Sequence, residues 1–147
     1  MSGADERARR VADTMLAREG TGPAWALQIE DAREGYARVA MTLRPDMLNG
    51  HGTAHGGMVF ALADTAFAYA CNSRNETSVA QHASIVFLSP AKDGERLIAE
   101  AREQAAAGRS GLYYVTVTGP EGRVVAEFQG LSRTIGGAVV PETGQES

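Results

Sequence analysis

The sequence has little cysteine, no excess of positive charge and no long uncharged apolar run. Cys71 is the single cysteine, so no disulfide can form within the chain, which favours a reducing, cytoplasmic location. Fourteen Lys and Arg against eighteen Asp and Glu give a net charge of −4, which disfavours binding to nucleic acid. The longest apolar run, residues 56–71, is too short to span a membrane and carries Asp64, and we see no signal peptide. We therefore expect a cytoplasmic protein without nucleic-acid or membrane partners.

Length and composition predict one compact domain. A chain of 147 residues with 44% apolar and 22% charged residues can bury one core and is typical of a globular protein. We expect a single domain over residues 1–147, in which about 1–22 form an N-terminal helix and lead-in and 138–147 form a loose tail.

The first third of the chain predicts a helix followed by a β-hairpin. Apolar residues at helical spacing indicate an amphipathic helix over residues 5–18. Trp25, Leu27 and Ile29 alternate with other residues in the period of a half-buried strand. A glycine turn and a second alternating run over residues 37–43 complete the predicted hairpin.

A single apolar helix is predicted in the middle of the chain. It covers residues 58–71 and follows a Gly- and His-rich loop over 45–57. Because this helix is apolar on nearly all sides, the rest of the protein must enclose it.

The remaining segments favour strands, with one conflict. Residues 79–88, 112–118 and 123–135 are rich in β-formers and are separated by turn sequences. Residues 95–107 favour a helix by propensity, but short turns on both sides and strands beyond them favour a strand, which we predict. The order predicts an α+β fold, in which an antiparallel sheet of five to six strands wraps around one central apolar helix, plus an N-terminal helix. A strand left at the sheet edge would invite pairing with a second copy, so we expect a dimer.

Asp64 is the first candidate for chemistry. It is the only charged residue between His55 and Arg74, in the middle of the apolar helix. An unpaired buried carboxylate is costly, so Asp64 needs partners or a cavity. Its environment is therefore either functional or that of a structural aspartate satisfied by backbone amides or by a partner chain.

Gly56 and Gly57 are the second candidates because they stand where the apolar helix begins. The first N–H groups of a helix have no partner within it, and glycine lets a ligand approach them closely. Such amides can stabilise an oxyanion that develops from a carbonyl. The alternative is a helix entry that simply needs unusual backbone angles.

His51 and His55 are four residues apart, a spacing that metal ligands use on a helix. The surrounding glycines favour a loop, and no cysteine or second acid is near in sequence, so we expect no metal and no cofactor. Hydrogen bonds that order the loop are the simpler interpretation.

The spacing of Gly56 and Asp64 suggests a site shared between two chains. Eight residues of helix separate them by roughly 12 Å, whereas both groups should lie close to one reacting carbonyl. Two antiparallel copies of the helix would bring Gly56 of one chain opposite Asp64 of the other. A thioester suits such a small site, because a thiolate leaving group with a parent pKa near ~8.5 needs no strong general acid.

The run NGHGTAHGGMVFALADTAFAYACNS, residues 49–73, closely resembles the phenylacetate-degradation (PaaI-type) acyl-CoA thioesterases of the hotdog fold. Weaker similarity extends over about residues 25–137, including RSGLYYVTV and LSRTIGG. The resemblance implies hydrolysis of acyl-CoA thioesters, phenylacetyl-CoA and hydroxylated relatives among them, without a metal. It also implies a dimer with a continuous sheet, commonly paired into a dimer of dimers.

The resemblance assigns roles to individual residues. Asp64 matches the catalytic carboxylate, as nucleophile or general base, and Gly56 matches the backbone N–H that polarises the thioester carbonyl from the other subunit. The resemblance also implies catalytic roles for Asn49, which would orient the carbonyl or a water, for His55, which would shape or polarise the site, and for Thr65, which would hold a water. Gly57, beside Gly56, would contact the substrate. The turn Arg109, Ser110 and Gly111 resembles a loop near the CoA moiety, although a surface arginine in a turn is as good an interpretation.

Two other functions stay open on the sequence alone. One is a non-catalytic acyl-CoA binding protein of the hotdog fold, in which Asp64 is structural. The other is a hotdog hydratase or dehydratase, for which His82 is the only histidine on the predicted strands.

Overall fold

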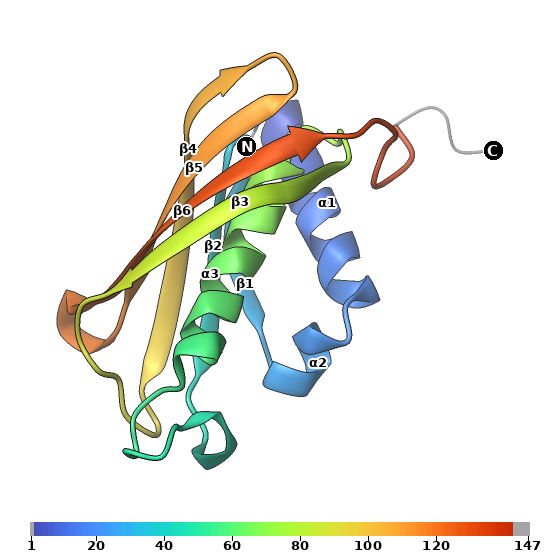
Figure 1. The fold of residues 1–147 in the computed structure, drawn as a ribbon. Helices are drawn as coiled ribbons and strands as arrows, with labels where there is room; N and C mark the ends of the chain where they lie inside the picture. The colour runs from blue at the N-terminus through green and yellow to red at the C-terminus, as the bar shows by residue number, and fades with distance from the viewer. Residues whose placement is uncertain (1, 143–147) are drawn as a thin grey trace.

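The computed structural model describes residues 2–142 and contains three α-helices, two short 3₁₀ turns and six strands (Figure 1). In chain order these are α1 (Gly3–Arg18), α2 (Thr21–Trp25), β1 (Gln28–Arg33), β2 (Tyr36–Thr42), η1 (Pro45–Met47), α3 (Gly56–Cys71), β3 (Ser78–Phe87), β4 (Arg96–Ala107), β5 (Ser110–Thr118), η2 (Pro120–Gly122) and β6 (Val124–Thr134). None of the described helices is long and apolar enough to cross a membrane.

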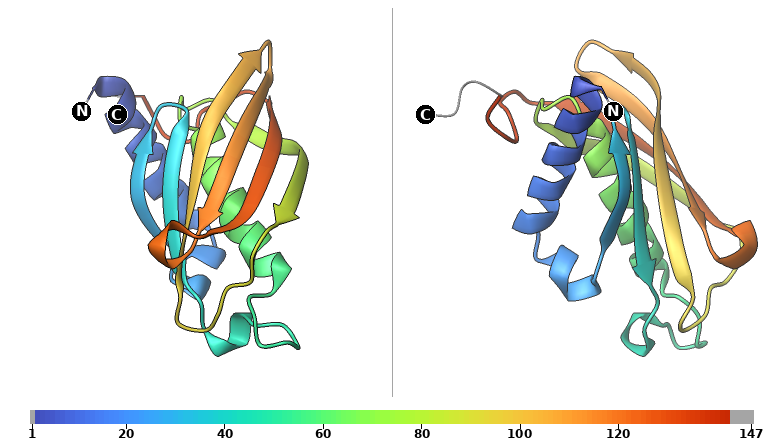
Figure 2. Two further views of the ribbon diagram at one scale, coloured as in Figure 1. Left: turned by 90° about the vertical axis from the view of Figure 1, so that its left-hand side faces the viewer. Right: turned by 180° about the vertical axis from the view of Figure 1, so that it is seen from behind.

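The strands form one antiparallel sheet in the order β1-β2-β4-β5-β6-β3. The chain therefore crosses the sheet after β3, which pairs with β6 and lies at one edge, while β1 lies at the other (Figure 2). Gly35, with φ of +72°, makes the predicted turn between β1 and β2.

The core lies between the curved sheet and α3, which runs along the inner face of the sheet (Figure 1). Strand residues alternate, so every second side chain points at this helix. The inward set comprises Ala37, Val39 and Met41 of β2, Leu97, Ala99 and Ala101 of β4, Tyr113, Val115 and Val117 of β5, and Ala126 and Phe128 of β6. Gly130 is required in β6 because a Cβ there would lie 2.8 Å from the ring of Phe67 on α3. The predicted hotdog arrangement, a sheet wrapped around one apolar helix, is confirmed.

The N-terminal helix is also confirmed, whereas the first strand was predicted to begin too early. Helix α1 buries Ala8, Val11 and Ala12 and packs on β1 and α3. Trp25, which the alternating pattern assigned to a strand, ends α2 instead. The chain then reverses through Ala26, whose φ of 52° is left-handed, and the strand starts only at Gln28.

The ambiguous segment 95–107 is a strand, as predicted against its helix propensity. Leu97, Ala99 and Ala101 of β4 are buried while the intervening side chains face outward. Pairing with β2 on one side and β5 on the other satisfies the backbone of β4, which outweighs local propensity.

The first part of the segment predicted as a loose tail contacts Asn75. The carboxamide of Asn75 accepts from the N–H groups of Val139 and Val140 and donates to the carbonyl of Val140, which is buried. Residues 143–147 lie outside the described residues.

Candidate functional site

The loop before α3 is held in place by the side chain of Asn49. Its Oδ1 accepts from the N–H groups of His51 (2.9 Å) and Thr53 (3.2 Å), and its Nδ2 donates to Oγ1 of Thr53 (3.0 Å). The loop is also tied to its surroundings, since the N–H of Ala54 donates to the carbonyl of Ala91 (2.8 Å). These bonds fix the position at which α3 begins.

The first turn of α3 leaves one amide without an acceptor. His55 is the N-cap, and its Nδ1 accepts from the N–H of Gly57 at 2.9 Å, while its carbonyl accepts from Met58 and Val59. No residue of the described range 2–142 accepts from the N–H of Gly56. Gly56 therefore keeps a free donor at the positive end of the helix dipole, whereas the amide of Gly57 is already engaged.

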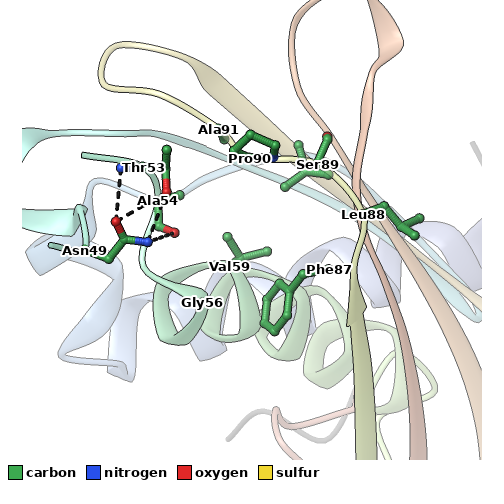
Figure 3. A pocket seen from close by; sticks show the side chains of 11 residues that line it. Asn49, Thr53, Ala54, Gly56, Val59, Phe87, Leu88, Ser89, Pro90 and Ala91 are labelled. Carbon is green, nitrogen blue, oxygen red and sulfur yellow. Dashed lines mark hydrogen bonds between the residues drawn. The ribbon is translucent and has the colours of Figure 1, made fainter. Parts of the chain in front are cut away.

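A pocket of about 370 Å³ opens beside Gly56 (Figure 3). It is lined by Asn49, Thr53, Ala54, Gly56, Val59, Phe87, Leu88, Ser89, Pro90, Ala91 and Val125. None of these lining residues carries a charge, so the pocket suits a neutral group.

Asp64 lies two turns further along α3 and is half-buried. Within residues 2–142 it has neither an ion pair nor a hydrogen bond to its carboxylate, and burial raises the pKa of the carboxyl above its ordinary value. Thr65 beside it donates its hydroxyl to the carbonyl of Ala61 at 2.7 Å. An unpaired carboxylate with a raised pKa is a candidate base or nucleophile.

Gly56 and Asp64 do not share a pocket within one protomer. Asp64 is absent from the lining of the pocket at Gly56, and eight residues of helix separate them by roughly 12 Å. One protomer therefore keeps the N–H of Gly56 and the carboxylate of Asp64 apart.

The sequence model of the thioesterase superfamily matches residues 51–126, more than half of the chain. The chain belongs to the thioesterase superfamily. Acyl-coenzyme A thioesterase PaaI of Escherichia coli is 39% identical over 136 residues, which cover 92% of this chain and 97% of that protein. The structure of E. coli PaaI, from the phenylacetic acid degradation operon, superposes with a TM-score of 0.90 at 38% identity and covers 92% of this chain and 99% of that one. A hypothetical thioesterase of Streptococcus pneumoniae, solved with coenzyme A, has a TM-score of 0.73 at 26% identity and covers 76% and 88%. The resemblance to PaaI-type thioesterases is thereby confirmed, and with it the class of hydrolases that act on thioester bonds.

In this thioesterase the face of α3 that carries Asp64 is left uncovered by the protomer. Phe60, Ala61, Asp64 and Ala68 are only partly buried, whereas the opposite face of the helix is buried in the core. Strand β3, at the adjacent sheet edge, is likewise exposed along most of its length. Within the described residues 2–142, neither the uncovered helix face nor the open sheet edge is covered by another part of the protomer.

The predicted substrate-binding turn lies at the other end of α3 from Gly56. Arg109, Ser110 and Gly111 line a pocket of about 230 Å³ together with Cys71 and Ser78. Arg109 is exposed. Packing alone accounts for the glycine at position 111, since a Cβ there would lie 2.9 Å from the ring of Tyr113. Within one protomer, the structure does not bring this turn to Gly56.

The remaining cysteine and histidine side chains are poorer candidates for a role in thioester hydrolysis. Burial raises the pKa of the Cys71 thiol to about 12, so it is not a thiolate nucleophile. His51 is exposed in the loop, and within the described residues no three His, Cys, Asp or Glu side chains are grouped as metal ligands would be. His82 is exposed on β3 and is not among the residues that line the pocket at Gly56.

Sequence reasoning missed one wall of the pocket. Phe87 and Leu88 lie beside Gly56 although they are 31 and 32 residues away in the sequence. The available signal was a pair of large apolar residues at the end of a strand, just before Pro90, which alone is indistinguishable from core sequence.

Proposed function

We propose that this thioesterase hydrolyses acyl-CoA thioesters to the free acid and CoA, with phenylacetyl-CoA and hydroxyphenylacetyl-CoA as substrates. The proposal rests on one observation, that a single helix carries two groups without hydrogen-bond partners among the described residues. These groups are the N–H of Gly56 and the carboxylate of Asp64. Similarity to the E. coli acyl-CoA thioesterase supports the substrate class.

The site we propose is shared by two protomers. A two-fold axis that places two α3 helices antiparallel brings Gly56 of one protomer opposite Asp64 of the other. The small residues Gly57, Ala61 and Ala68 on the uncovered face of α3 allow the two helices to approach closely. The two β3 edges would then pair and continue the sheet, which gives the expected dimer.

In the reaction, the thioester carbonyl oxygen accepts from the N–H of Gly56, which polarises the carbonyl carbon. Asp64 then either removes a proton from water, which attacks the carbon, or attacks it directly to form an anhydride that water cleaves. The C–S bond breaks and its electrons leave with the CoA thiolate. Label in the Asp64 carboxylate after one turnover in isotopically labelled water would identify the anhydride route with water attack at the Asp64 carbonyl carbon, because general-base catalysis places label only in the product acid.

The neighbouring residues have supporting roles in this proposal. Asn49 and His55 fix the loop and the first turn of α3, and the hydroxyl oxygen of Thr65 can still accept a hydrogen bond from a water beside Asp64. Because His55 occupies the amide of Gly57, we assign oxyanion binding to Gly56 alone.

The turn over residues 109–111 would contact CoA bound mainly by the other protomer. Its pocket includes Ser78, at the start of β3, whereas the pocket at Gly56 includes Phe87, at the end of β3. Antiparallel pairing of two β3 edges brings these two ends together, so Arg109 can approach a CoA phosphate. We also propose that dimers pair into tetramers through the outer face of the sheet, where Tyr114 is exposed.

The test is release of free thiol from phenylacetyl-CoA by the purified protein, with a mass measurement in solution to define the assembly. We expect turnover by the wild type and none by D64A in an assembly of unchanged mass. Saturable CoA-ester binding without thiol release would favour a non-catalytic binding protein, and a change in double-bond absorbance without thiol release would favour a hydratase or dehydratase.

A further inference from the structure

The Cζ atom of the Phe87 ring points toward Gly56. A Cβ built on Gly56 would lie 3.1 Å from Cζ of Phe87 and 3.5 and 3.6 Å from its Cε1 and Cε2. Phe87 is the last residue of β3, and its ring lies over the beginning of α3 (Figure 3). Any group that accepts from the N–H of Gly56 therefore binds close to this ring.

The direction of the Phe87 side chain is set by the strand. Val86 and Phe87 pair with Glu127 and Ala126 of β6, and consecutive residues of a strand point to opposite faces. Phe87 therefore faces the α3 side, while Val86 faces the outer surface and lines a groove there with Tyr114. Phe87 is 53% exposed and Val86 59% exposed, so neither side chain fills the core of its own protomer.

The space beside Phe87 is suited to an acyl group. The aromatic ring, Val59, Leu88 and Val125 supply apolar walls, and the lining has no cation that would bind the phosphates of CoA. An aromatic ring prefers another aromatic ring at its edge or offset face, in addition to the gain from burying apolar surface.

We propose that Phe87 determines the acyl preference of the enzyme by packing against the acyl group whose carbonyl oxygen accepts from Gly56. The inference rests on the proposed function and adds a specificity residue to it. The ring favours aromatic acyl groups, such as phenylacetyl, over an acetyl group, which offers the ring only one methyl group to contact.

The experiment compares kcat/KM for phenylacetyl-CoA and acetyl-CoA in F87A and F87L. A lost contact in an apolar pocket costs roughly 10-fold or more, so we expect F87A to lose about 10-fold on phenylacetyl-CoA and less than about 3-fold on acetyl-CoA. F87L, which keeps an apolar side chain, should give an intermediate change in the ratio. V86A is the matched control, since it shortens the adjacent exposed side chain on the opposite face and should leave the ratio unchanged.

Each outcome either supports or overturns the inference. Equal losses on both substrates in both Phe87 variants would contradict it, because the ring would then act on the shared CoA portion or on assembly. If F87A fails to assemble, the ratio measured for F87L decides. Failure of the proposed function is distinct: the wild type would then release no thiol from any acyl-CoA, whereas failure of this inference leaves an active wild type with an unchanged substrate ratio in the variants.

Discussion

The N–H of Gly57 donates to Nδ1 of His55 at 2.9 Å, so the histidine that begins α3 caps the helix with its own ring. Because Nδ1 accepts this bond, the ring proton of the neutral imidazole is on Nε2. The bond removes one of the two neighbouring glycine amides from use, and the N–H of Gly56 is left as the donor for a substrate carbonyl.

His55 can be replaced by residues that cap equally well but differ in charge. Asp at the N-cap should keep or raise the melting temperature, because it accepts from the Gly57 N–H and complements the helix dipole. The same negative charge would repel the oxyanion at Gly56, so we expect H55D to lose at least ~10-fold in kcat. H55N, the neutral control, should keep both stability and most of the activity. Parallel loss of activity in H55D and H55N would argue against an electrostatic effect at this position.

The N–H of Gly56 can be removed without breaking the helix. Proline is favoured at the first helical position, and His55, with φ of −63° and ψ of 132°, already has the backbone conformation that precedes proline. Loss of one oxyanion donor lowers kcat by about 10²–10³-fold, which we expect for G56P in a thiol-release assay. G56A makes the same Cβ contact with Phe87 but keeps the N–H, so it should be much less impaired. Similar rates for the two variants would show that this amide does not bind the carbonyl.

The pKa of Asp64 has consequences for activity and stability with pH. Burial raises this pKa above its ordinary 3.8, so kcat/KM should fall below an inflection that lies above that value. A raised pKa also means that the folded state binds the proton more tightly, so this contribution to stability is present at low pH and is lost as pH rises through the folded pKa.

D64N cannot ionise and should escape that loss. The free energy of unfolding of D64N minus that of the wild type should therefore grow as pH rises from about 3 to 7. Denaturant unfolding at several pH values measures this difference. A D64N protein that is less stable than the wild type at pH 7 would instead mark Asp64 as a structural residue.

Arg74 and Glu103 predict the opposite dependence on pH. Nη1 and Nη2 of Arg74 donate to the two carboxylate oxygens of Glu103 at 2.9 and 2.8 Å, and this interaction lowers the pKa of Glu103. Its contribution is present above the ordinary pKa and is lost as pH falls through the lowered one. We expect R74A to cost about 1 kcal/mol of unfolding free energy near pH 7, and less in acid. R9A, which breaks an exposed pair with Asp13 in α1, is the control and should have a smaller effect.

The sequence alone predicted the fold class because one hydrophobic pattern, the apolar helix in the middle of the chain, dominated. The apolar helix with Asp64 in it had to be enclosed, and that requirement predicted both the fold class and the most informative residue. Strand β4 could be predicted only from the turns and strands that flank it in the sequence. Taken by themselves, residues such as Ala99 and Ala101 favour a helix, and it is pairing with β2 and β5 that makes this segment a strand.

Other features depend on contacts that have no local signature. The strand predicted at Trp25 was wrong because the left-handed turn at Ala26 is not visible in an alternating pattern. The docking of the tail on Asn75 joins residues about 65 positions apart. The occupied amide of Gly57 and the ring of Phe87 beside Gly56 depend on side-chain orientation and on distant strands, which is why neither could be predicted.

The shared site is tested most directly by mixing two inactive chains. D64A keeps the amide of Gly56, and G56P keeps the carboxylate of Asp64, so a mixed dimer contains one site in which both groups are intact. If subunits of a 1:1 mixture are allowed to exchange, random pairing should restore about a quarter of the wild-type thiol release. A mixture that stays as inactive as its parents, although mass measurement shows mixed dimers, would contradict a site built from two protomers.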